Sequence, residues 1–414
     1  MSTSIITYFR QRLVELVGPV AISTLSIWIA SPCAAQLAYL QTNLVSDIPG
    51  MAANTDPHLV NPWGIASSGS SPFWVSDNGT GVSTLYNTSG TPQSLVVTIP
   101  PAPGGVGPGT PTGVVFNGSS DFEVNPGAPA RFIFATEAGT IAAWAPSVGT
   151  IAVTKVDNSA AGAVYKGLAI GNNGAGNFLY ASNFGSNAIN VFSATYSPTS
   201  LPGSFVDPNV PAGFAPFNIQ NLGGTLYVTY AKVNPADPEE DLAGPGNGFV
   251  DRFDTNGNLL NRLITMGPLN SPWGVATAPP GFGKFANDLL VGNFGDGRIN
   301  AFDPVTGAFL GFLKDTNGNP IEIDGLWGLR VGNGGNGGDP DTVYFTAGIS
   351  DEQHGLFGSI ASSVPDSSST LALFPPLLAT ARSGLPSPLK SAVTTPPGPL
   401  PTAKSCLAAN TPLP

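Results

Sequence analysis

The stretch SPWGVATAPPGFGKFANDLLVGNFGDGRINAFDPVTG, residues 271–307, carries the pattern from which the fold is predicted. A short apolar strand begins at its Pro-Trp-Gly corner and is ended by Pro-Pro-Gly. A second apolar strand at 288–292 leads into Asn-Phe-Gly-Asp-Gly, which is typical of a turn because Gly and Asn adopt positive φ at low cost. Polar and apolar residues alternate at 298–302, and a fourth strand is expected at 308–313. Four antiparallel strands joined by tight turns form one blade of a β-propeller.

Weaker copies of this unit recur along the chain at intervals of 49 to 56 residues. Their corner positions are Gly64, Gly113, Gly167, Asn218, Gly274 and Gly328. A steady period of this length with four strands in each copy indicates a propeller, so six copies predict an all-β, six-bladed β-propeller of four-stranded antiparallel blades. The sixth copy lacks a fourth strand, whereas 37–47 is a spare strand. We therefore expect the N-terminal strand to complete the last blade and close the ring, which also hides an exposed edge.

The composition bounds the class of protein. The 414 residues suffice for a large core, and 52 Gly with 41 Pro make turns frequent. Only 10% of the residues are charged, with a net charge of -11. A nucleic-acid-binding protein would show a basic stripe, so we expect no nucleic-acid partner. We expect the propeller to occupy 36–360 and to be a monomer.

Both ends of the chain differ from the repeats. Residues 1–35 resemble a signal peptide, with Arg10 and Arg12 before a largely apolar run and Cys-Ala-Ala before Gln36. They predict an exported, secreted or periplasmic protein without a transmembrane segment after cleavage; a retained membrane anchor is the alternative. Cleavage would leave Cys406 as the single remaining cysteine, which excludes an intrachain disulfide and a zinc–thiolate site. Residues 361–414 are rich in Pro, Ser and Thr and predict a disordered tail.

Strand order predicts which face carries function. If the strands of each blade are lettered A to D, the B–C connections and the connections from D to the next A lie on the same face. We expect the binding site there, at the mouth of the central channel. The candidate ligand-binding residues are Trp63, Trp273, Trp327, Lys166 and Tyr230. The tryptophans favour either packing of the inner strands or stacking on a sugar or aromatic ligand. Lys166 either pairs with Glu137 or binds an anion.

Oxygen-bearing side chains at the ends of B strands suggest a cation site. The candidate metal ligands are Asp77, Glu137, Asn183 and Asn293, which either cap turns or hold a divalent cation such as calcium. The long acidic B–C insertion at 232–248 is expected on the same face.

Blades six and one are neighbours in a closed ring, which places the only two histidines on one side of the channel mouth. The candidate catalytic residues are His354, Asp351, Glu352 and His58. They could ligate a metal or act as acid and base, or they are ordinary surface groups.

Several segments together resemble a known family. LVSDIPGMAANTDPHLVNPWGIASS (44–68), FWVSDNGTGVSTLYN (73–87), NSPWGV (270–275), NFGDGRINAFDP (293–304) and DEQHGLFGSI (351–360) are similar to an uncharacterised family of exported bacterial β-propeller proteins, some of which carry a PEP-CTERM sorting segment. This chain lacks such an apolar anchor followed by basic residues at its end. More loosely, the blade rhythm resembles NHL-repeat and gluconolactonase-like propellers. Blade similarity does not transfer activity, and the resemblance supplies no catalytic residue.

These observations favour an exported propeller that binds a small molecule, a carbohydrate or a protein at the channel mouth, or acts as a scaffold. The alternative is a metal-dependent hydrolase or lyase, lactonase-like, with a divalent cation in the central channel. A third hypothesis is a component of the extracellular matrix or cell surface.

Overall fold

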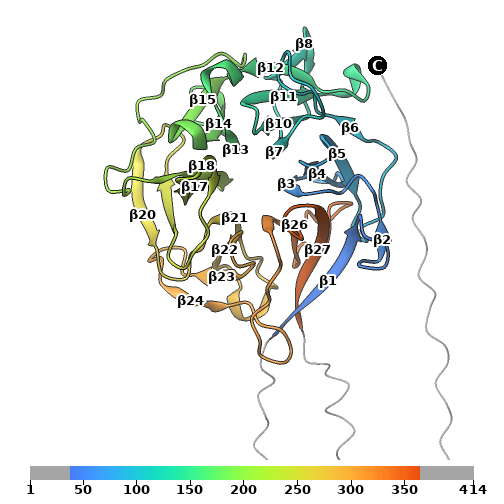
Figure 1. Cartoon of the computed structure of the whole chain (residues 1–414), viewed down its shortest axis with the longest axis vertical. Helices are drawn as coiled ribbons and strands as arrows, with labels where there is room; N and C mark the ends of the chain where they lie inside the picture. Colours follow the sequence, from blue (N-terminus) through green and yellow to red (C-terminus); the bar gives the residue numbers. More distant parts are fainter. Residues whose placement is uncertain (1–37, 364–414) are drawn as a thin grey trace, which may run out of the picture. The chain divides into compact units, whose positions relative to one another are not determined.

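The computed structural model describes residues 38–363, which form a ring of β-sheets (Figure 1). The predicted signal peptide and nearly all of the predicted tail lie outside the described residues. Within them the only helices are four 3-10 turns, η1 (Pro146–Val148), η2 (Ser159–Ala161), η3 (Phe184–Ser186) and η4 (Gly283–Phe285). No helix of this part of the chain is long and apolar enough to cross a membrane.

Six sheets follow one another in chain order, each with its A strand nearest the axis. Blade one comprises β3 (Pro62–Ala66), β4 (Phe73–Asp77), β5 (Val82–Tyr86) and β6 (Val97–Thr98). Blade two comprises β7 (Pro111–Phe116), β10 (Phe132–Thr136), β11 (Thr140–Trp144) and β12 (Val153–Asp157), with the hairpin β8 (Glu123–Asn125) and β9 (Ala128–Pro129) in its A–B connection. Blade three comprises β13 (Tyr165–Asn172), β14 (Asn177–Asn183) and β15 (Ala188–Ser193), with one bridge between Phe192 and Pro198 in place of a D strand.

The remaining blades complete the ring. Blade four comprises β16 (Phe214–Leu222), β17 (Thr225–Asn234), β19 (Gly248–Phe253) and β20 (Leu259–Thr265), and β18 (Asp237–Asp241) pairs with β17. Blade five comprises β21 (Pro272–Thr277), β22 (Leu289–Asn293), β23 (Ile299–Phe302) and β24 (Phe309–Phe312). Blade six comprises β25 (Leu326–Val331), β26 (Val343–Ile349), β27 (His354–Ser363) and β1 (Ala38–Ser46), with β2 (Asn54–Thr55) parallel to β1.

Ring closure depends on β1. This strand pairs antiparallel with β27 from Ala38 opposite Ser363 to Ser46 opposite Leu356, and the two lie side by side in blue and orange in Figure 1. Each A strand also contacts the A strands of both neighbouring blades, including β25 and β3 across the closure. The predicted six-bladed propeller, closed by its N-terminal strand, is therefore confirmed.

Every A strand carries a β-bulge at its corner. In blade five, Pro272 pairs with Asn293 and Gly274 with Gly292, so Trp273 is an extra residue without a cross-strand partner. A bulge of this kind re-aims a side chain, and here it turns Trp273 toward the axis. The equivalent extra residues in the other blades are Trp63, Thr112, Lys166, Phe217 and Trp327.

The glycine after each bulge is required by the close approach of neighbouring A strands. A Cβ atom on Gly274 would lie 2.6 Å from the Trp327 carbonyl oxygen, and one on Gly328 would lie 2.7 Å from that of Trp63. In blade four Asn218 occupies this position, and its Nδ2 donates a 2.8 Å hydrogen bond to the Trp273 carbonyl. The backbones therefore form a tight ring around the axis.

Apolar clusters fill the seams, the interfaces between neighbouring blades. Between blades one and two, for example, Trp74 stacks on Phe132 with ring centroids 4.0 Å apart and packs against Trp144. Burial of such surface is worth about 25 cal/mol per Å² and makes the blades a rigid support for the residues at the axis.

Candidate functional site

Three of the oxygen-bearing residues predicted to hold a cation make separate hydrogen bonds to nearby backbone groups. Asp77 Oδ2 accepts a 3.0 Å hydrogen bond from the Thr84 amide, and Asn183 Oδ1 accepts one of 3.0 Å from the Val164 amide. Asn293 Nδ2 donates to a carbonyl oxygen 2.9 Å away. Each of these side chains forms a hydrogen bond with a backbone N–H or C=O group of its own blade or of the adjacent seam. Within 38–363 no three His, Cys, Asp or Glu side chains come together in a way that could hold a metal ion.

Glu137 does not occupy the strand-end position that Asp77, Asn183 and Asn293 share. Thr136 pairs with Pro111 as Asp77 pairs with Pro62, so Thr136 is the strand end of blade two and Glu137 lies on the following turn. Tyr230, predicted to bind ligand, lies at the seam between blades three and four. It lines a cavity of about 150 Å³ there, and burial raises its pKa.

The three corner tryptophans meet on the axis. Trp63 stacks on Trp327 with ring centroids 3.6 Å apart, and Trp273 packs edge-on against both. All three are buried, with at most 4% of their surface exposed, and Phe217 packs with them. We call Trp63, Trp273 and Trp327 the tryptophan plug. It closes the channel toward the B–C connections, so the packing interpretation accounts for these residues.

Lys166 lies beside the plug and is completely buried. Its Nζ is 2.7 Å from Glu137 Oε1, 3.3 Å from both carboxylate oxygens of Glu240 and 5.1 Å from the centre of the Trp63 ring. Burial alone would lower the pKa of Lys166, but the two carboxylates outweigh it and raise the pKa. The predicted ion pair with Glu137 is therefore present, and β18 brings the acidic insertion to the same ammonium group.

Glu352 faces the same group of charges. Its Oε1 is buried and has no hydrogen-bond partner in the described part of the chain. Burial, together with Glu137 and Glu240, raises the pKa of Glu352 to about 7, against the opposing effect of Lys166. Its backbone φ is +62°, the last of three consecutive left-handed residues. Such conformations cost free energy in non-glycine residues and often mark functional sites.

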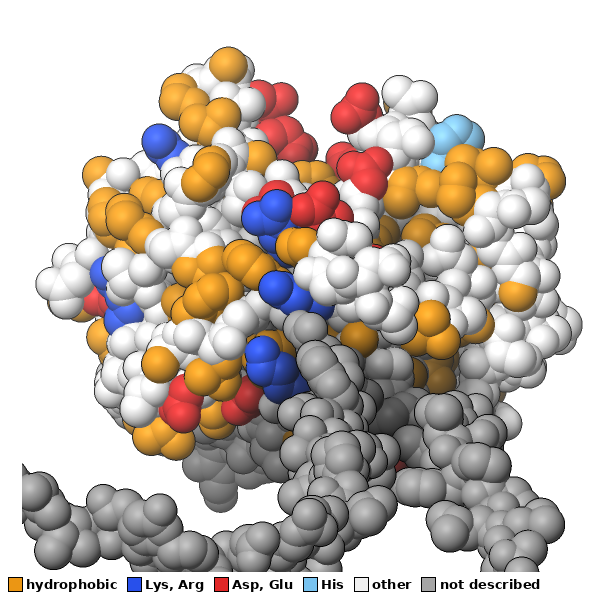
Figure 2. Space-filling model, turned by 90° about the horizontal axis from the view of Figure 1, so that it is seen from below, with side chains coloured by type: hydrophobic (Ala, Val, Ile, Leu, Met, Phe, Trp, Pro, Cys, Tyr) orange, Lys and Arg blue, Asp and Glu red, His pale blue; other side chains and the backbone are white. Residues whose placement is uncertain are grey.

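The acidic mouth is the name we give to Glu137, Lys166, Glu240, Asp241 and Glu352. Asp241 completes it, accepting a hydrogen bond from Ser271. Figure 2 shows acidic side chains and a histidine along one rim of the propeller. The sequence placed these residues on the correct face, but their contact with one another depends on how the insertion folds.

The two histidines each pair with a separate aspartate. His58 Nδ1 is 2.9 Å from Asp56 Oδ1, and His354 Nδ1 is 2.6 Å from Asp47 Oδ2. Their side chains are 50% and 42% exposed. In residues 38–363 neither ring hydrogen-bonds to Glu352 or to Asp351, which is exposed on the turn before it. The hydrogen bonds of the two histidines therefore lead to Asp56 and Asp47, which the sequence did not single out.

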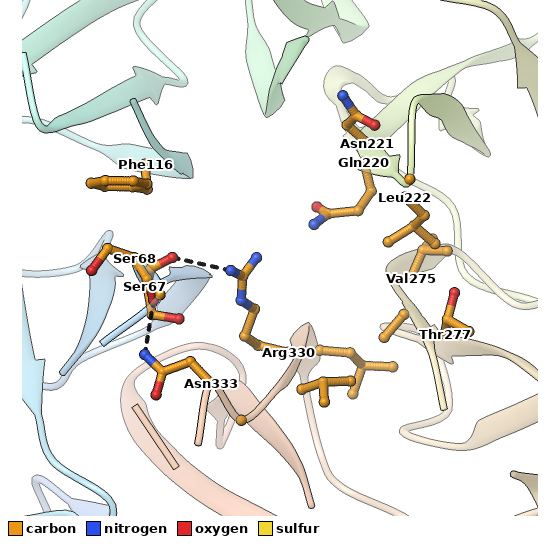
Figure 3. A pocket seen from close by; sticks show the side chains of 16 residues that line it. Ser67, Ser68, Phe116, Gln220, Asn221, Leu222, Val275, Thr277, Arg330 and Asn333 are labelled. Carbon is orange, nitrogen blue, oxygen red and sulfur yellow. Dashed lines mark hydrogen bonds between the residues drawn. The ribbon is translucent and has the colours of Figure 1, made fainter. Parts of the chain in front are cut away.

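A cavity opens at the opposite mouth of the channel, where the A strands end. Its volume is about 530 Å³. We call it the axial cavity. Figure 3 shows side chains from different blades around it, including Ser67, Phe116, Gln220, Leu222, Val275 and Arg330.

Among the described residues, Arg330 is the only charged one that lines the axial cavity. Its Nη2 donates a 3.1 Å hydrogen bond to the Ser67 carbonyl, and no carboxylate pairs with it in the described residues. Burial lowers the pKa of Arg330. The Ser67 hydroxyl is also buried without a partner, and the Gln220 side chain makes no hydrogen bond within 38–363.

Other polar residues of the cavity are already engaged. Asn221 donates to the Ile170 carbonyl at 2.8 Å, and Asn333 donates to the Ser68 carbonyl at 2.8 Å. Arg330, Ser67 and Gln220 are therefore among the groups with unused capacity for a ligand. None of these three residues was predicted from the sequence. One available signal was the position two residues after each corner, where the blades carry Ala66, Val115, Ala169, Gln220, Ala276 and Arg330.

Comparison with known proteins places the chain among uncharacterised relatives. No protein-family model matches it. Two uncharacterised proteins of Acanthamoeba polyphaga mimivirus, R648 and L690, are 34% and 33% identical to it over 327 residues. These alignments cover 77% of this chain and 78% and 84% of the two viral proteins.

The solved structures that it resembles are distant in sequence. A streptogramin B lyase matches with a TM-score of 0.46 at 14% identity, covering 79% of this chain and 98% of that one. An auxiliary nutrient binding protein from Bacteroides ovatus matches with a TM-score of 0.48 at 12% identity, covering 80% of this chain and 78% of that one. The identity and coverage of the viral alignments establish that the chain belongs to the same family as the uncharacterised mimivirus proteins R648 and L690.

Proposed function

We propose that this protein binds a small organic molecule in the axial cavity and that the propeller serves as its rigid scaffold. The observation that carries the proposal is the mostly buried guanidinium of Arg330, which faces this cavity without a carboxylate partner in the described residues. A cavity of about 530 Å³ is within the range of small-molecule sites.

The energetics support a site made for a ligand. Burying a charge without a counter-charge costs free energy, and a ligand that supplies hydrogen bonds to Arg330 would recover part of that cost. The walls of the cavity are A strands from several blades, whose positions are set by the ring. Binding to such a pre-formed site requires little ordering of the protein.

The metal-dependent hydrolase or lyase has less support. Its predicted ligands Asp77, Asn183 and Asn293 are engaged in separate hydrogen bonds, and no three His, Cys, Asp or Glu side chains of residues 38–363 come together to hold a metal ion. The acidic mouth is separated from the channel interior by the tryptophan plug, so a ligand bound at that face would lie on the surface.

Export remains part of the proposal. It rests on the sequence of 1–35 alone, with its basic start and apolar run. The relatives reported above are viral, so membership of an exported bacterial family also stays a prediction. Mass spectrometry of the mature protein from its native host should find Gln36 as the first residue; an intact residue 1 would contradict export by cleavage.

A screen of small molecules tests the binding function. Purified full-length chain is examined by ligand-observed NMR with a library of neutral and charged fragments. Thr277 is exposed at the rim of the axial cavity, so Thr277→Trp should block the cavity and abolish most binding.

Thr195→Trp, on an exposed turn that does not line the axial cavity, is the matched control and should retain binding. A library without hits, or hits that bind equally well to the Thr277 variant, would contradict the proposal.

A further inference from the structure

Resting on the proposed function, we infer that the ligand of the axial cavity is a small organic monocarboxylate. Its carboxylate is bound by Arg330, and its apolar body lies against the opposite wall of the cavity. The inference names the chemical class of the ligand, which the binding function alone does not determine.

The charge of the cavity is the first argument. A guanidinium has five N–H donors, and the structure assigns one hydrogen bond of Arg330 to the Ser67 carbonyl. No Asp or Glu of residues 38–363 lines the cavity. A carboxylate entering it would meet a cation with free donors and no competing negative charge. The planar fork of Arg matches the two oxygens of a carboxylate, which makes this pairing stronger than a neutral hydrogen bond.

The distribution of polar and apolar groups is the second argument. In Figure 3 the Arg330 side chain extends into the cavity between Gln220 and Ser67. The Ser67 hydroxyl, on a residue only 3% exposed, is unpartnered in the described residues. The other walls carry Phe116, Leu222 and Val275. The cavity therefore has a polar side centred on the guanidinium, and its remaining walls, which also carry Asn221 and Thr277, include apolar groups that fit a hydrocarbon or aromatic body.

The repeats supply the third argument. Four of the five positions equivalent to Arg330 carry only Ala or Val, so a propeller A strand does not need a charged side chain there. The small side chains on neighbouring blades leave the volume into which Arg330 reaches. The fold does not require an arginine at this position, so the presence of Arg330 in one blade alone points to a role in binding.

A single positive charge favours a monocarboxylate over a phosphate. Within the part of the chain that the structure describes, Arg330 is the sole charged residue of the lining, without a Lys or a second Arg. A phosphate ester carries up to two negative charges and commonly binds at several cations or at a cluster of backbone N–H groups. One carboxylate balances one guanidinium.

The test compares acids with their amides, which have nearly the same shape. Benzoate, cyclohexanecarboxylate and hexanoate are titrated against full-length chain by NMR or calorimetry beside benzamide, cyclohexanecarboxamide and hexanamide. We expect at least one acid to bind about ten- to a hundredfold tighter than its amide, the range for a charge-assisted hydrogen-bonded pair. In Arg330→Gln this preference should disappear, and in Arg330→Lys it should be reduced.

Arg131→Gln, at an exposed arginine that does not line the cavity, is the control and should keep the full preference. Thermal unfolding of each variant verifies folding. If Arg330→Gln does not fold, the acid-over-amide difference in thermal stabilisation of the wild-type chain decides the question. Amides that bind as well as acids would overturn the carboxylate while leaving the binding function intact. A cavity that binds neither these probes nor any library fragment would overturn both.

Discussion

Glu352 shows how strongly position alters a single carboxyl group in this protein. Its pKa rises from the ordinary 4.5 to about 7 because the group is buried and faces Glu137 and Glu240. Lys166 lies in the same cluster and opposes the rise. Since Lys166 is already paired at 2.7 Å with Glu137, it does not neutralise every carboxylate of the acidic mouth.

This raised pKa predicts that stability falls as pH rises. Between pH 4.5 and about 7 the folded chain holds a proton on Glu352 that the unfolded chain has released, so the free energy of unfolding decreases across that window. Glu352→Gln cannot ionise and should lack this loss. We expect the variant to gain about 1 to 3 kcal/mol over wild type between pH 5 and pH 8, as measured by urea unfolding.

Glu123→Gln is the control, at an exposed glutamate on β8. Its stability relative to wild type should change little over the same pH range. A Glu352 variant that follows the wild-type pH profile would show that the carboxyl group is ionised throughout.

For single residues, the sequence shows which positions stand out better than it shows where their side chains point. The Trp-Gly corners were readily identified, but whether Trp273 points to a ligand or to a neighbour depends on the bulge beside it. In blade two the corner residue Pro111 pairs with Thr136, so the strand ends at Thr136, one residue before the predicted Glu137. Arg330 was missed because a lone Arg in a strand carries no motif; its meaning comes from the cavity that several blades form.

Among the strands, β1 is the one that closes the ring. It provides the outer strand of blade six and pairs along its length with β27. The antiparallel ladder covers the edge of β27, which would otherwise be free to pair with another chain. Ser46 adds a hydrogen bond from its hydroxyl to the Gly355 carbonyl at 2.8 Å.

A proline within β1 should therefore open the ring. Thr42 lies opposite Ser359 and its side chain is exposed, so Thr42→Pro changes the backbone with little change in packing. Proline removes an N–H donor and cannot be accommodated in a paired strand without loss. We expect a loss of roughly 2 to 4 kcal/mol in the free energy of unfolding, with some aggregation, measured by urea unfolding and size-exclusion chromatography.

Thr42→Ala separates this effect from loss of the side chain. It should remain within about 0.5 kcal/mol of wild type, as surface substitutions usually do. Equal stability of the proline and alanine variants would mean that closure by β1 contributes little.

The spare strand at the start of the chain was recognisable because the sixth copy was one strand short. Blade three, by contrast, has no fourth strand, and only the Phe192–Pro198 bridge occupies its place. The sequence did not reveal this difference. Turn residues predict where strands begin, but a short outer strand depends on its neighbours for pairing. Sequence pattern therefore predicts inner strands better than outer ones.

Across the propeller as a whole, the glycine corners determine how closely the blades approach. The Cβ positions of Gly64, Gly113 and Gly167 would each fall within 2.4 Å of an atom of the next blade. Gly274 and Gly328 continue the ring. The recurrence of these glycines was visible in the sequence as a period, and the structure supplies its cause.

Gly274→Ala should push blades five and six apart. Its new methyl group would meet the Trp327 carbonyl at 2.6 Å and Leu329 Cγ at 2.8 Å, and the carbonyl, as part of the backbone, can yield only if the blades shift. Overpacking of this kind costs about 1 to 3 kcal/mol, measurable as a lower melting temperature. Gly176→Ala, whose Cβ would have 3.7 Å to its nearest neighbour, should be neutral or slightly stabilising. Similar losses in both variants would argue against a tight axial ring.

The pairing of β1 with β27 also has a consequence in time. Ala38 and Ser363 are hydrogen-bonded although 325 residues separate them in the chain. A ribosome adding about 5 to 20 residues per second needs roughly 16 to 65 seconds for that interval. The strand that is made first must therefore remain unpaired until nearly the whole propeller has been synthesised. The ring can therefore close only after β27, the last strand of the propeller, has been synthesised.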